Sequence, residues 1–282
     1  MIDITAASRF MATHARLLDR RRFEALVDGA PPDGLLAALA AYRNADGGFG
    51  WALEADLRSP SSQPAGALHA FEVLAEAGVT SPMAAGLCDW LDAVTLPDGG
   101  LPFALAGADS PGTARWWAGA DTTRSSLHIT SAVCACAHRV PDVAQHPWLQ
   151  RATEYCLREI AALREPQGAH QLSFALQLLD AVEADEELER LARFLPPSGE
   201  LAVPGGLPDE KLRPLDHSPE PGPLRRHIAP EAIERDLDRL AAEQRADGGW
   251  EIDFAPASPA AALEWRGYVT VRAIAVLRAN GR

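Results

Sequence analysis

Lysine and cysteine are both scarce in this sequence, and each scarcity excludes a class of site. Lys211 is the only lysine among 26 basic residues, and we interpret the preference for arginine as the codon usage of a GC-rich genome, not as a phosphate site. The four cysteines, Cys88, Cys134, Cys136 and Cys156, show neither a CxxC pair nor the cysteine–histidine spacing of a zinc site. We therefore expect no structural zinc, and buried free thiols in a reducing cytoplasm.

Excess positive charge and long apolar runs are also missing. The formal net charge is −13, whereas a nucleic-acid-binding protein needs a basic face, so we expect no nucleic-acid partner. No apolar run approaches the roughly 18–20 residues that a membrane span needs. The charged N-terminal stretch has no apolar core of a signal peptide. These absences indicate a cytoplasmic protein without a transmembrane segment, and they leave its oligomeric state open.

An Asp-Gly-Gly triplet recurs along the chain, at residues 46–48, 98–100 and 247–249. Asp98 follows Asp46 by 52 residues, and Asp247 follows Asp98 by 149 residues, which is close to three further steps. A period of this length indicates stacked supersecondary units. We expect two degenerate copies near residues 148 and 198, the latter in "PPSGELAVPGG".

The repeated unit reads as a helix, an Asp-Gly-Gly turn, a long loop and a second helix. Glycine ends a helix in the left-handed conformation at little cost, and aspartate bonds the main chain two residues further on. The following aromatic residue, Phe49 or Trp250, is expected to pack over the exposed helix end. The segments between the turns, "VTVRAIAVL" near the C-terminus included, are assigned as helices from their apolar spacing or their place in the unit.

These units predict one all-α domain over residues 1–282, an α/α toroid, or barrel, of about ten to twelve helices in hairpins. A proline-rich excursion at about residues 204–227 interrupts the pattern. Its stretch 211–226 is not expected to form regular helix, because proline breaks helices. We interpret it as a surface excursion or a lid.

The third turn resembles a motif of the terpenoid cyclase and protein prenyltransferase superfamily. In "QRADGGW", Gln244, Gly248 and Trp250 match the QW repeat of squalene–hopene cyclase-like proteins. Looser copies are Arg43, Gly47 and Phe49, and then Thr95, Gly99 and Leu101. The chain also resembles bacterial prenyltransferase-like proteins through "DGGFG", "LEADLR" and "EWRGYVTV". The resemblance implies the toroid fold and an apolar, isoprenoid ligand.

The motifs that carry the chemistry of that superfamily are absent. The sequence has neither an Asp-x-Asp-Asp acid motif nor the aspartate-rich motif that binds Mg²⁺, and no local zinc-ligand set. We expect no cofactor, except Mg²⁺ if the substrate is a diphosphate. The resemblance therefore implies an architecture and a ligand class without naming a reaction.

In a toroid, the loops after the triplets gather at one end of the barrel, where a ligand site is expected. The candidate catalytic residues there are Glu54, Asp56 and Asp121. The candidate substrate-binding residues are Arg58, Gln63, Trp116, Trp117, Arg124, Asp253, Glu264, Trp265 and Arg266.

Each candidate has a structural alternative. Glu54 and Asp56 alternate in a segment that we expect to be extended, so they form an acid and a base, or Arg58 neutralises them and pins the loop. Asp121 is an acid, or it caps the next helix. His69 and His128 are core residues or bases.

The aromatic and arginine candidates carry similar alternatives. Trp116 and Trp117 line a pocket or anchor their loop. "EWR" at residues 264–266 forms an internal ion pair beside a packed tryptophan, or contacts the ligand.

Three functions follow from these candidates. The first is a terpenoid cyclase-like or prenyltransferase-like protein that acts on or binds an apolar, isoprenoid small molecule in the barrel cavity. The second is a glycan-active toroid with paired carboxylates and tryptophan platforms. The third is a non-catalytic binding or scaffold module.

Overall fold

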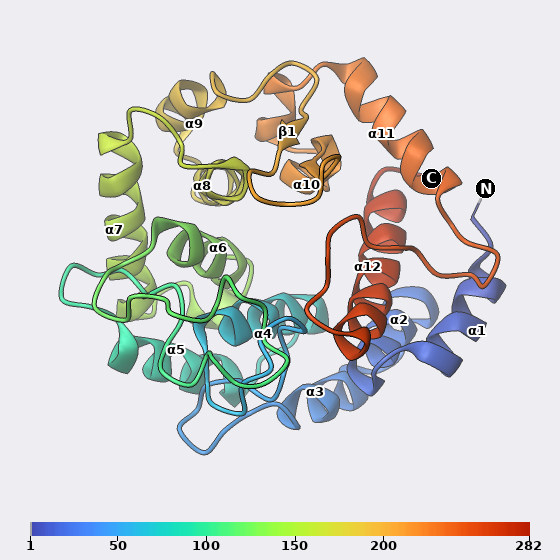
Figure 1. Cartoon of the computed structure of the whole chain (residues 1–282), viewed down its shortest axis with the longest axis horizontal. Helices are drawn as coiled ribbons and strands as arrows, with labels where there is room; N and C mark the ends of the chain where they lie inside the picture. The colour runs from blue at the N-terminus through green and yellow to red at the C-terminus, as the bar shows by residue number, and fades with distance from the viewer. Residues whose placement is uncertain (1) are drawn as a thin grey trace. The chain divides into compact units, whose positions relative to one another are not determined.

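The computed structural model describes residues 2–282, and these residues fold almost wholly as helices (Figure 1). Helix accounts for 54% of the chain, in twelve α-helices. Over residues 2–282 the only sheet is an antiparallel pair of two-residue strands. The predicted all-α class and helix number are confirmed. Among these residues every helix is too short or too polar to cross a lipid bilayer.

The chain divides into two compact units. Unit 1 contains Met1–Ala30, Glu165–Asp180 and Ala184–Arg282, and unit 2 contains Pro31–Arg164 and Ala181–Glu183. The prediction of a single domain stays a prediction.

Unit 2 is built around two neighbouring helices, α4 (Pro64–Ala77) and α6 (Leu127–Ala137), which pack against each other. Around them lie α3 (Pro32–Ala40), α5 (Pro82–Val94), the 3₁₀ helix η1 (Pro141–Val143) and α7 (Pro147–Ala162). The core joins α4 to α7 through Phe71, whose ring stacks on Trp148 with centroids 6.4 Å apart. Both of these aromatic residues are fully buried.

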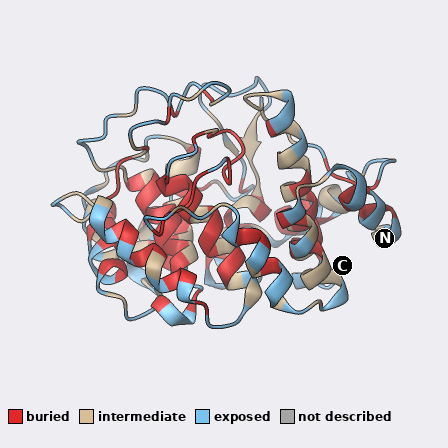
Figure 2. Cartoon of the chain, turned by 90° about the horizontal axis from the view of Figure 1, so that it is seen from below, coloured by how far each residue is buried: buried red, intermediate tan, exposed pale blue. Residues whose placement is uncertain are grey.

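Unit 1 centres on the long helix α12 (Pro259–Ala279), which packs against α1 (Ile4–His14), α2 (Leu17–Asp28) and α11 (Pro230–Ala242). The predicted helix "VTVRAIAVL" lies within α12 and is confirmed. The remaining elements are α8 (Ala169–Ala181), α9 (Asp185–Ala192), β1 (Leu201–Ala202), β2 (Lys211–Leu212), α10 (Pro214–His217) and η2 (Pro223–His227). Buried residues gather on one side of most helices, whereas most loops are exposed (Figure 2).

The proline-rich segment differs from its prediction. It contains two short helices, α10 and η2, and each begins with proline, because a proline in the first turn loses no helical hydrogen bond. Leu215, His217 and Leu224 are buried, and Asp236 of α11 accepts the Leu215 N–H at 3.0 Å. The expectation of no regular helix is therefore wrong for these turns. The middle of the segment is part of the packed interior of unit 1.

His217 makes the stability of unit 1 depend on pH. Its Nδ1 lies 2.9 Å from the Ser173 hydroxyl and its Nε2 lies 3.1 Å from the Gly199 carbonyl, which a neutral ring satisfies by accepting at one nitrogen and donating at the other. Burial holds the pKa of His217 below its usual 6.5. The unfolded chain therefore binds a proton just below pH 6.5 that the folded chain does not, and stability falls as the pH drops below that value.

We expect the melting temperature of the wild type to fall as the pH is lowered from neutrality through 6.5. In His217→Gln the melting temperature at neutral pH should be lower, because two buried hydrogen bonds are changed, and it should fall less as the pH is lowered. Thermal unfolding followed by circular dichroism measures both. The control is His14→Gln, since His14 is exposed. Parallel pH curves for the wild type and His217→Gln would refute this assignment.

The three Asp-Gly-Gly turns share one geometry. The first glycine of each triplet has a φ of 95°, 95° and 97° in chain order, a left-handed conformation. The N–H of the second glycine donates to the aspartate Oδ1 at 2.9, 3.1 and 3.0 Å. The predicted aspartate bond and left-handed glycine are confirmed in all three copies. The expectation that this glycine ends the helix is wrong, because α3, α5 and α11 end at Ala40, Val94 and Ala242, several residues before it.

Each turn aspartate also holds a residue just before or inside the following helix. Asp46 accepts the Ser62 hydroxyl at 2.8 Å, Asp98 accepts the Ser125 hydroxyl at 2.6 Å, and Asp247 pairs with Arg266 at 2.8 Å. The turns therefore tie the end of one helix to the start of the next. The indole N–H of Trp250 donates to a carbonyl in the last turn of α11 at 2.8 Å, so this aromatic residue packs over the helix end as predicted.

The two expected degenerate copies have different outcomes. Residue 148 lies in the first turn of α7, so the expectation of a copy there is wrong. Near residue 198, Gly199 is left-handed with a φ of 67°, and the Ser198 hydroxyl accepts the Glu200 N–H at 3.3 Å. Serine there accepts the bond that aspartate accepts in the triplets.

Candidate functional site

The loop that follows the first turn carries Glu54 and Asp56 in tight turns. Trp51 and Ala52 have left-handed φ values of 56° and 59°, and the Leu57 N–H donates to the Glu54 carbonyl at 3.0 Å. The expected extended segment, with Glu54 and Asp56 alternating on one side, is therefore wrong. Consecutive left-handed residues other than glycine are costly, and the sequence gives no sign of them.

Glu54 belongs to a buried acid–histidine–acid arrangement. Glu54 is 7% exposed, and its Oε2 lies 3.8 Å from Nε2 of His69 on α4. The other ring nitrogen, Nδ1, lies 2.8 Å from Oε2 of Glu72. We call these three residues the Glu54–His69–Glu72 group. The contact with Glu72 is a hydrogen bond, whereas the 3.8 Å contact with Glu54 is an electrostatic one, so Glu72 orients the ring beside the Glu54 carboxyl.

Glu72 was missed among the candidates, although its spacing could have revealed it. Residues three apart on a helix lie on one face, so Glu72 was placed to meet His69. Asp56 is 2% exposed, and its N–H lies 3.4 Å from the Glu54 carboxylate. The structure therefore brings Glu54 and Asp56 together through the main chain.

Gln63 and Arg58 join the loop 51–63 to the loop after the second turn. The Gln63 side chain accepts the Leu105 N–H at 2.8 Å and donates to the Ala106 carbonyl at 3.2 Å. The Arg58 N–H donates to the Thr113 hydroxyl at 2.9 Å. Gln63, which is 1% exposed, has a positioning role between these loops.

Asp121 lies apart from the buried carboxylates. It is exposed and accepts the hydroxyl and the N–H of Thr123 at 2.6 and 2.9 Å. These bonds, the hydroxyl first, hold the pKa of Asp121 below its usual range, which does not suit a proton donor near neutral pH. The helix-cap alternative is also wrong, because the N-cap residue of α6 is Ser126. None of the contacts of Asp121 is with Glu54 or Asp56.

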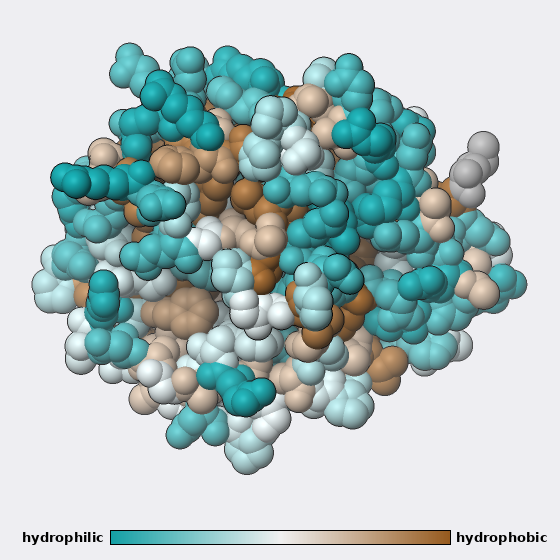
Figure 3. Space-filling model, turned by 45° about the horizontal axis from the view of Figure 1, so that its top comes forward, coloured by the Kyte–Doolittle hydropathy of each residue, from teal (hydrophilic) through white to brown (hydrophobic). Residues whose placement is uncertain are grey.

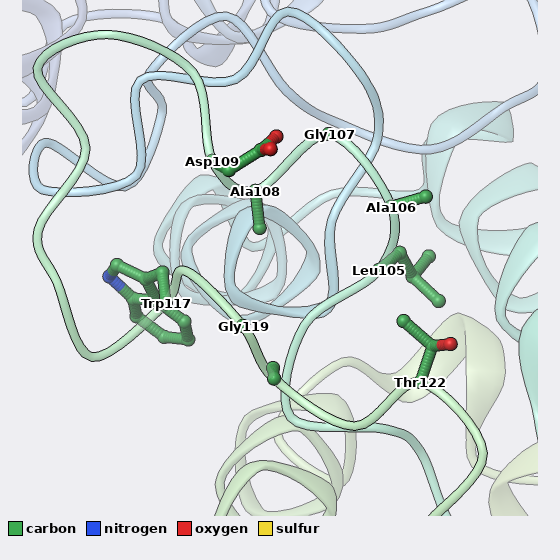
Figure 4. A pocket seen from close by; sticks show the side chains of 9 residues that line it. Leu105, Ala106, Gly107, Ala108, Asp109, Trp117, Gly119 and Thr122 are labelled. Atoms are coloured by element: carbon green, nitrogen blue, oxygen red, sulfur yellow. The ribbon is translucent and has the colours of Figure 1, made fainter.

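A small cavity of about 270 Å³ opens in the loop between α5 and α6 (Figure 4). Its wall includes Leu105 and Ala106, which Gln63 holds, and also Trp117. The Trp117 ring is 7% exposed and stacks on Phe103, with centroids 4.6 Å apart. In Figure 4 the indole nitrogen lies on the side away from the other labelled residues, so the carbon part of the ring faces them.

The two tryptophans of this loop therefore differ. Trp117 lines the cavity, whereas Trp116 is 53% exposed. Arg124 is also exposed. The ring of His128 on α6 packs against that of Phe103, with centroids 5.3 Å apart.

The candidates of unit 1 make structural contacts. Arg266 pairs with Asp247 and with Glu251, the latter at 3.2 Å, and its guanidinium lies 4.6 Å from the ring centre of Phe10. Asp253 pairs with Arg213. The ion-pair interpretation of "EWR" fits Arg266, although its partners lie outside that motif.

Trp265 is held between two aromatic rings. Phe254 and Tyr268 meet it edge to face, with centroids 5.5 and 5.3 Å away. Glu264 is half-buried beside it. These contacts describe a packed tryptophan within unit 1.

The cysteines are free thiols, and three of the four are buried. Burial raises the pKa of Cys88 to about 12 and also raises those of Cys136 and Cys156, so these thiols stay protonated and unreactive. Among residues 2–282, no three histidine, cysteine, aspartate or glutamate side chains are grouped to hold a metal ion.

The face of the molecule in Figure 3 is covered largely by hydrophilic residues, in keeping with the net charge of −13, and apolar residues appear there in smaller areas. The sequence was also compared with known proteins. No protein-family model matches the chain, and no curated protein is similar enough to it to count as a relative.

Proposed function

We propose that the chain forms an α/α toroid of the terpenoid cyclase and prenyltransferase kind, and that it binds and acts on an apolar isoprenoid molecule. The three turns support the architecture, because each joins two helices in the same way. The Leu105 and Trp117 side chains in the cavity wall support the ligand class, since apolar and aromatic side chains are typical of small-molecule sites; Asp109 and Thr122 supply polar groups to the same wall. Its volume of about 270 Å³ would hold part of such a ligand.

The observation that carries a catalytic role is the Glu54–His69–Glu72 group, in which Glu54 and His69 are buried and Glu72 is half-buried. In the proposed reaction, the Glu54 carboxyl donates its proton to a carbon–carbon double bond of the isoprenoid, and a carbocation forms. A proton lost from a later cation returns to the solvent. Glu54 regains its proton from the solvent, so the protons balance. The His69 ring, which the 2.8 Å contact with Glu72 orients, lies 3.8 Å from the Glu54 carboxyl and acts on it electrostatically. Aromatic rings such as Trp117 would stabilise the positive charge.

This mechanism needs no cofactor. Mg²⁺ enters only if the substrate is a diphosphate, in which case it would arrive bound to the phosphates. The cytoplasmic location remains a prediction.

Glu54→Gln tests the proposal, because it removes the acid and keeps the shape and the acceptor for the Asp56 N–H. The probes are geraniol, farnesol, squalene and the diphosphates of the two alcohols. For a probe that the wild type turns over, we expect the turnover rate of Glu54→Gln to be lower by about a hundredfold or more. The control is Glu154→Gln on α7, since Glu154 is exposed. Product analysis by gas chromatography reads the result. Equal turnover by Glu54→Gln would exclude Glu54 as the acid.

The second candidate function is glycan binding, which two exposed tryptophans favour. Trp51 is 58% exposed and Trp116 is 53% exposed, and both belong to unit 2. The Trp51 indole N–H donates to Asn44 at 2.8 Å, which fixes the ring on the surface. Loss of oligosaccharide binding in Trp51→Ala, with isoprenoids inert, would favour this function. If neither ligand class binds, the scaffold interpretation stands.

A further inference from the structure

A second cavity, of about 380 Å³, lies wholly within unit 1. Helix α11 supplies Arg235, Asp236 and Arg239 to its wall; Arg239 follows Arg235 by four residues and Asp236 by three, so it shares a helix face with each of them. Arg213 comes from the residue before α10, and Glu200 comes from the residue before β1. Three arginines therefore line one cavity in a chain whose net charge is −13.

The two carboxylates of the wall already have partners. Asp236 is 5% exposed, and it accepts the Leu215 N–H at 3.0 Å and the Arg239 Nε at 2.7 Å. Glu200 pairs with Lys211, the only lysine of the chain, at 2.7 Å. The hydrogen bond from Lys211 holds the pKa of Glu200 below its usual range, so this carboxylate stays charged and paired.

The arginines, by contrast, keep unused donors. Arg235 is exposed and makes no hydrogen bond or ion pair with any other residue from 2 to 282. Arg239 uses Nε on Asp236 and Nη1 on Glu243, which leaves Nη2. Arg213 uses Nη1 on Asp253 and on the Lys211 carbonyl, which leaves Nε and Nη2.

We propose that this cavity binds a phosphate-bearing small molecule, with Arg235 as its principal ligand and Arg213 and Arg239 completing the site. Guanidinium groups on several sides suit a tetrahedral phosphate, which offers more acceptor oxygens than one carboxylate. The cavity is large enough for a diphosphate or for a phosphate with an organic remainder. The proposal does not rest on the proposed function, since it concerns unit 1 alone.

Arg235→Gln is a suitable test, because the Arg235 side chain makes no hydrogen bond or ion pair among residues 2–282 and acts on Glu200 only through its charge. Isothermal titration with inorganic pyrophosphate is expected to show saturable binding by the wild type, and binding at least about tenfold weaker by Arg235→Gln. The matched control is Arg245→Gln, which removes another exposed arginine of unit 1 outside the cavity and should leave the affinity unchanged.

Three outcomes would overturn the proposal. The first is no saturable binding by the wild type. The second is an equal loss of affinity in the two arginine variants, as general attraction to positive charge would cause. The third is binding of citrate as tight as that of pyrophosphate, which would replace the phosphate assignment by a carboxylate one. The isoprenoid turnover of Glu54→Gln does not affect any of these binding results. The proposed function and the phosphate site can therefore be refuted independently of each other.

Discussion

Gly248→Ala is expected to lower the free energy of unfolding by about 4 kcal/mol, the largest effect of any substitution considered for this chain. Two costs combine at this position. Gly248 has a φ of 97°, which costs a residue with a Cβ about 1–2 kcal/mol. A Cβ there would also lie 2.1 Å from the Ala6 carbonyl oxygen, a main-chain atom that cannot swing aside. Urea unfolding followed by circular dichroism measures the change.

Gly29→Ala separates the two costs. Gly29, at the end of α2 in the same unit, has a φ of 65°, and a Cβ added there would meet nothing within 4 Å. Gly29→Ala should therefore lower the free energy of unfolding only by the cost of the left-handed conformation, about 1–2 kcal/mol. Equal losses at the two glycines would mean that the third turn does not pack against α1 as described.

Arg266→Gln is expected to destabilise the chain by about 2 kcal/mol, after allowance for the partial exposure of its partners. The substitution removes the ion pairs with Asp247 and Glu251 and the contact with the ring of Phe10. Arg245→Gln is the control in the same turn, since its side chain is exposed. The comparison asks whether Arg266 stabilises the fold, as its contacts indicate, or contacts a ligand.

The pH dependence of the Arg266 effect is a further check on the same pair. Partial burial alone would raise the pKa of Asp247, but the hydrogen bond from Arg266 lowers it below 3.8. The pair therefore contributes stability above pH 3.8 that is lost as the pH falls through the lowered value. The difference in the free energy of unfolding between the wild type and Arg266→Gln should therefore become smaller as the pH falls below 3.8. A difference that persists in acid would point to packing on Phe10 as the main contribution.

The turns were predictable because their physics is local. Aspartate and two glycines fix the hydrogen bond and the left-handed residue without help from distant contacts. Helices followed from apolar spacing for the same reason. The short helices at Pro214 and Pro223 were missed because proline was read as a breaker, although it is tolerated in the first turn.

The candidate site was less predictable, because it depends on contacts between distant loops. The Gln63 side chain accepts the N–H of Leu105, which is 42 residues away in the sequence, and no local sequence pattern predicts that hydrogen bond. The left-handed turn at Trp51 and Ala52 changes where Glu54 points, and only its surroundings can hold it there. Glu72, three residues after His69, was open to prediction and shows that helical spacing should be checked around every buried histidine.

The most direct test of the central claim is equilibrium binding of isoprenoids to the wild-type chain. Equilibrium dialysis with farnesol, farnesyl diphosphate and squalene, beside cello- and malto-oligosaccharides, compares the ligand classes in one format. We expect saturable binding of at least one isoprenoid, weakened by Trp117→Ala because Trp117 lines the cavity. Saturable binding of an oligosaccharide, with no binding of any isoprenoid, would contradict it.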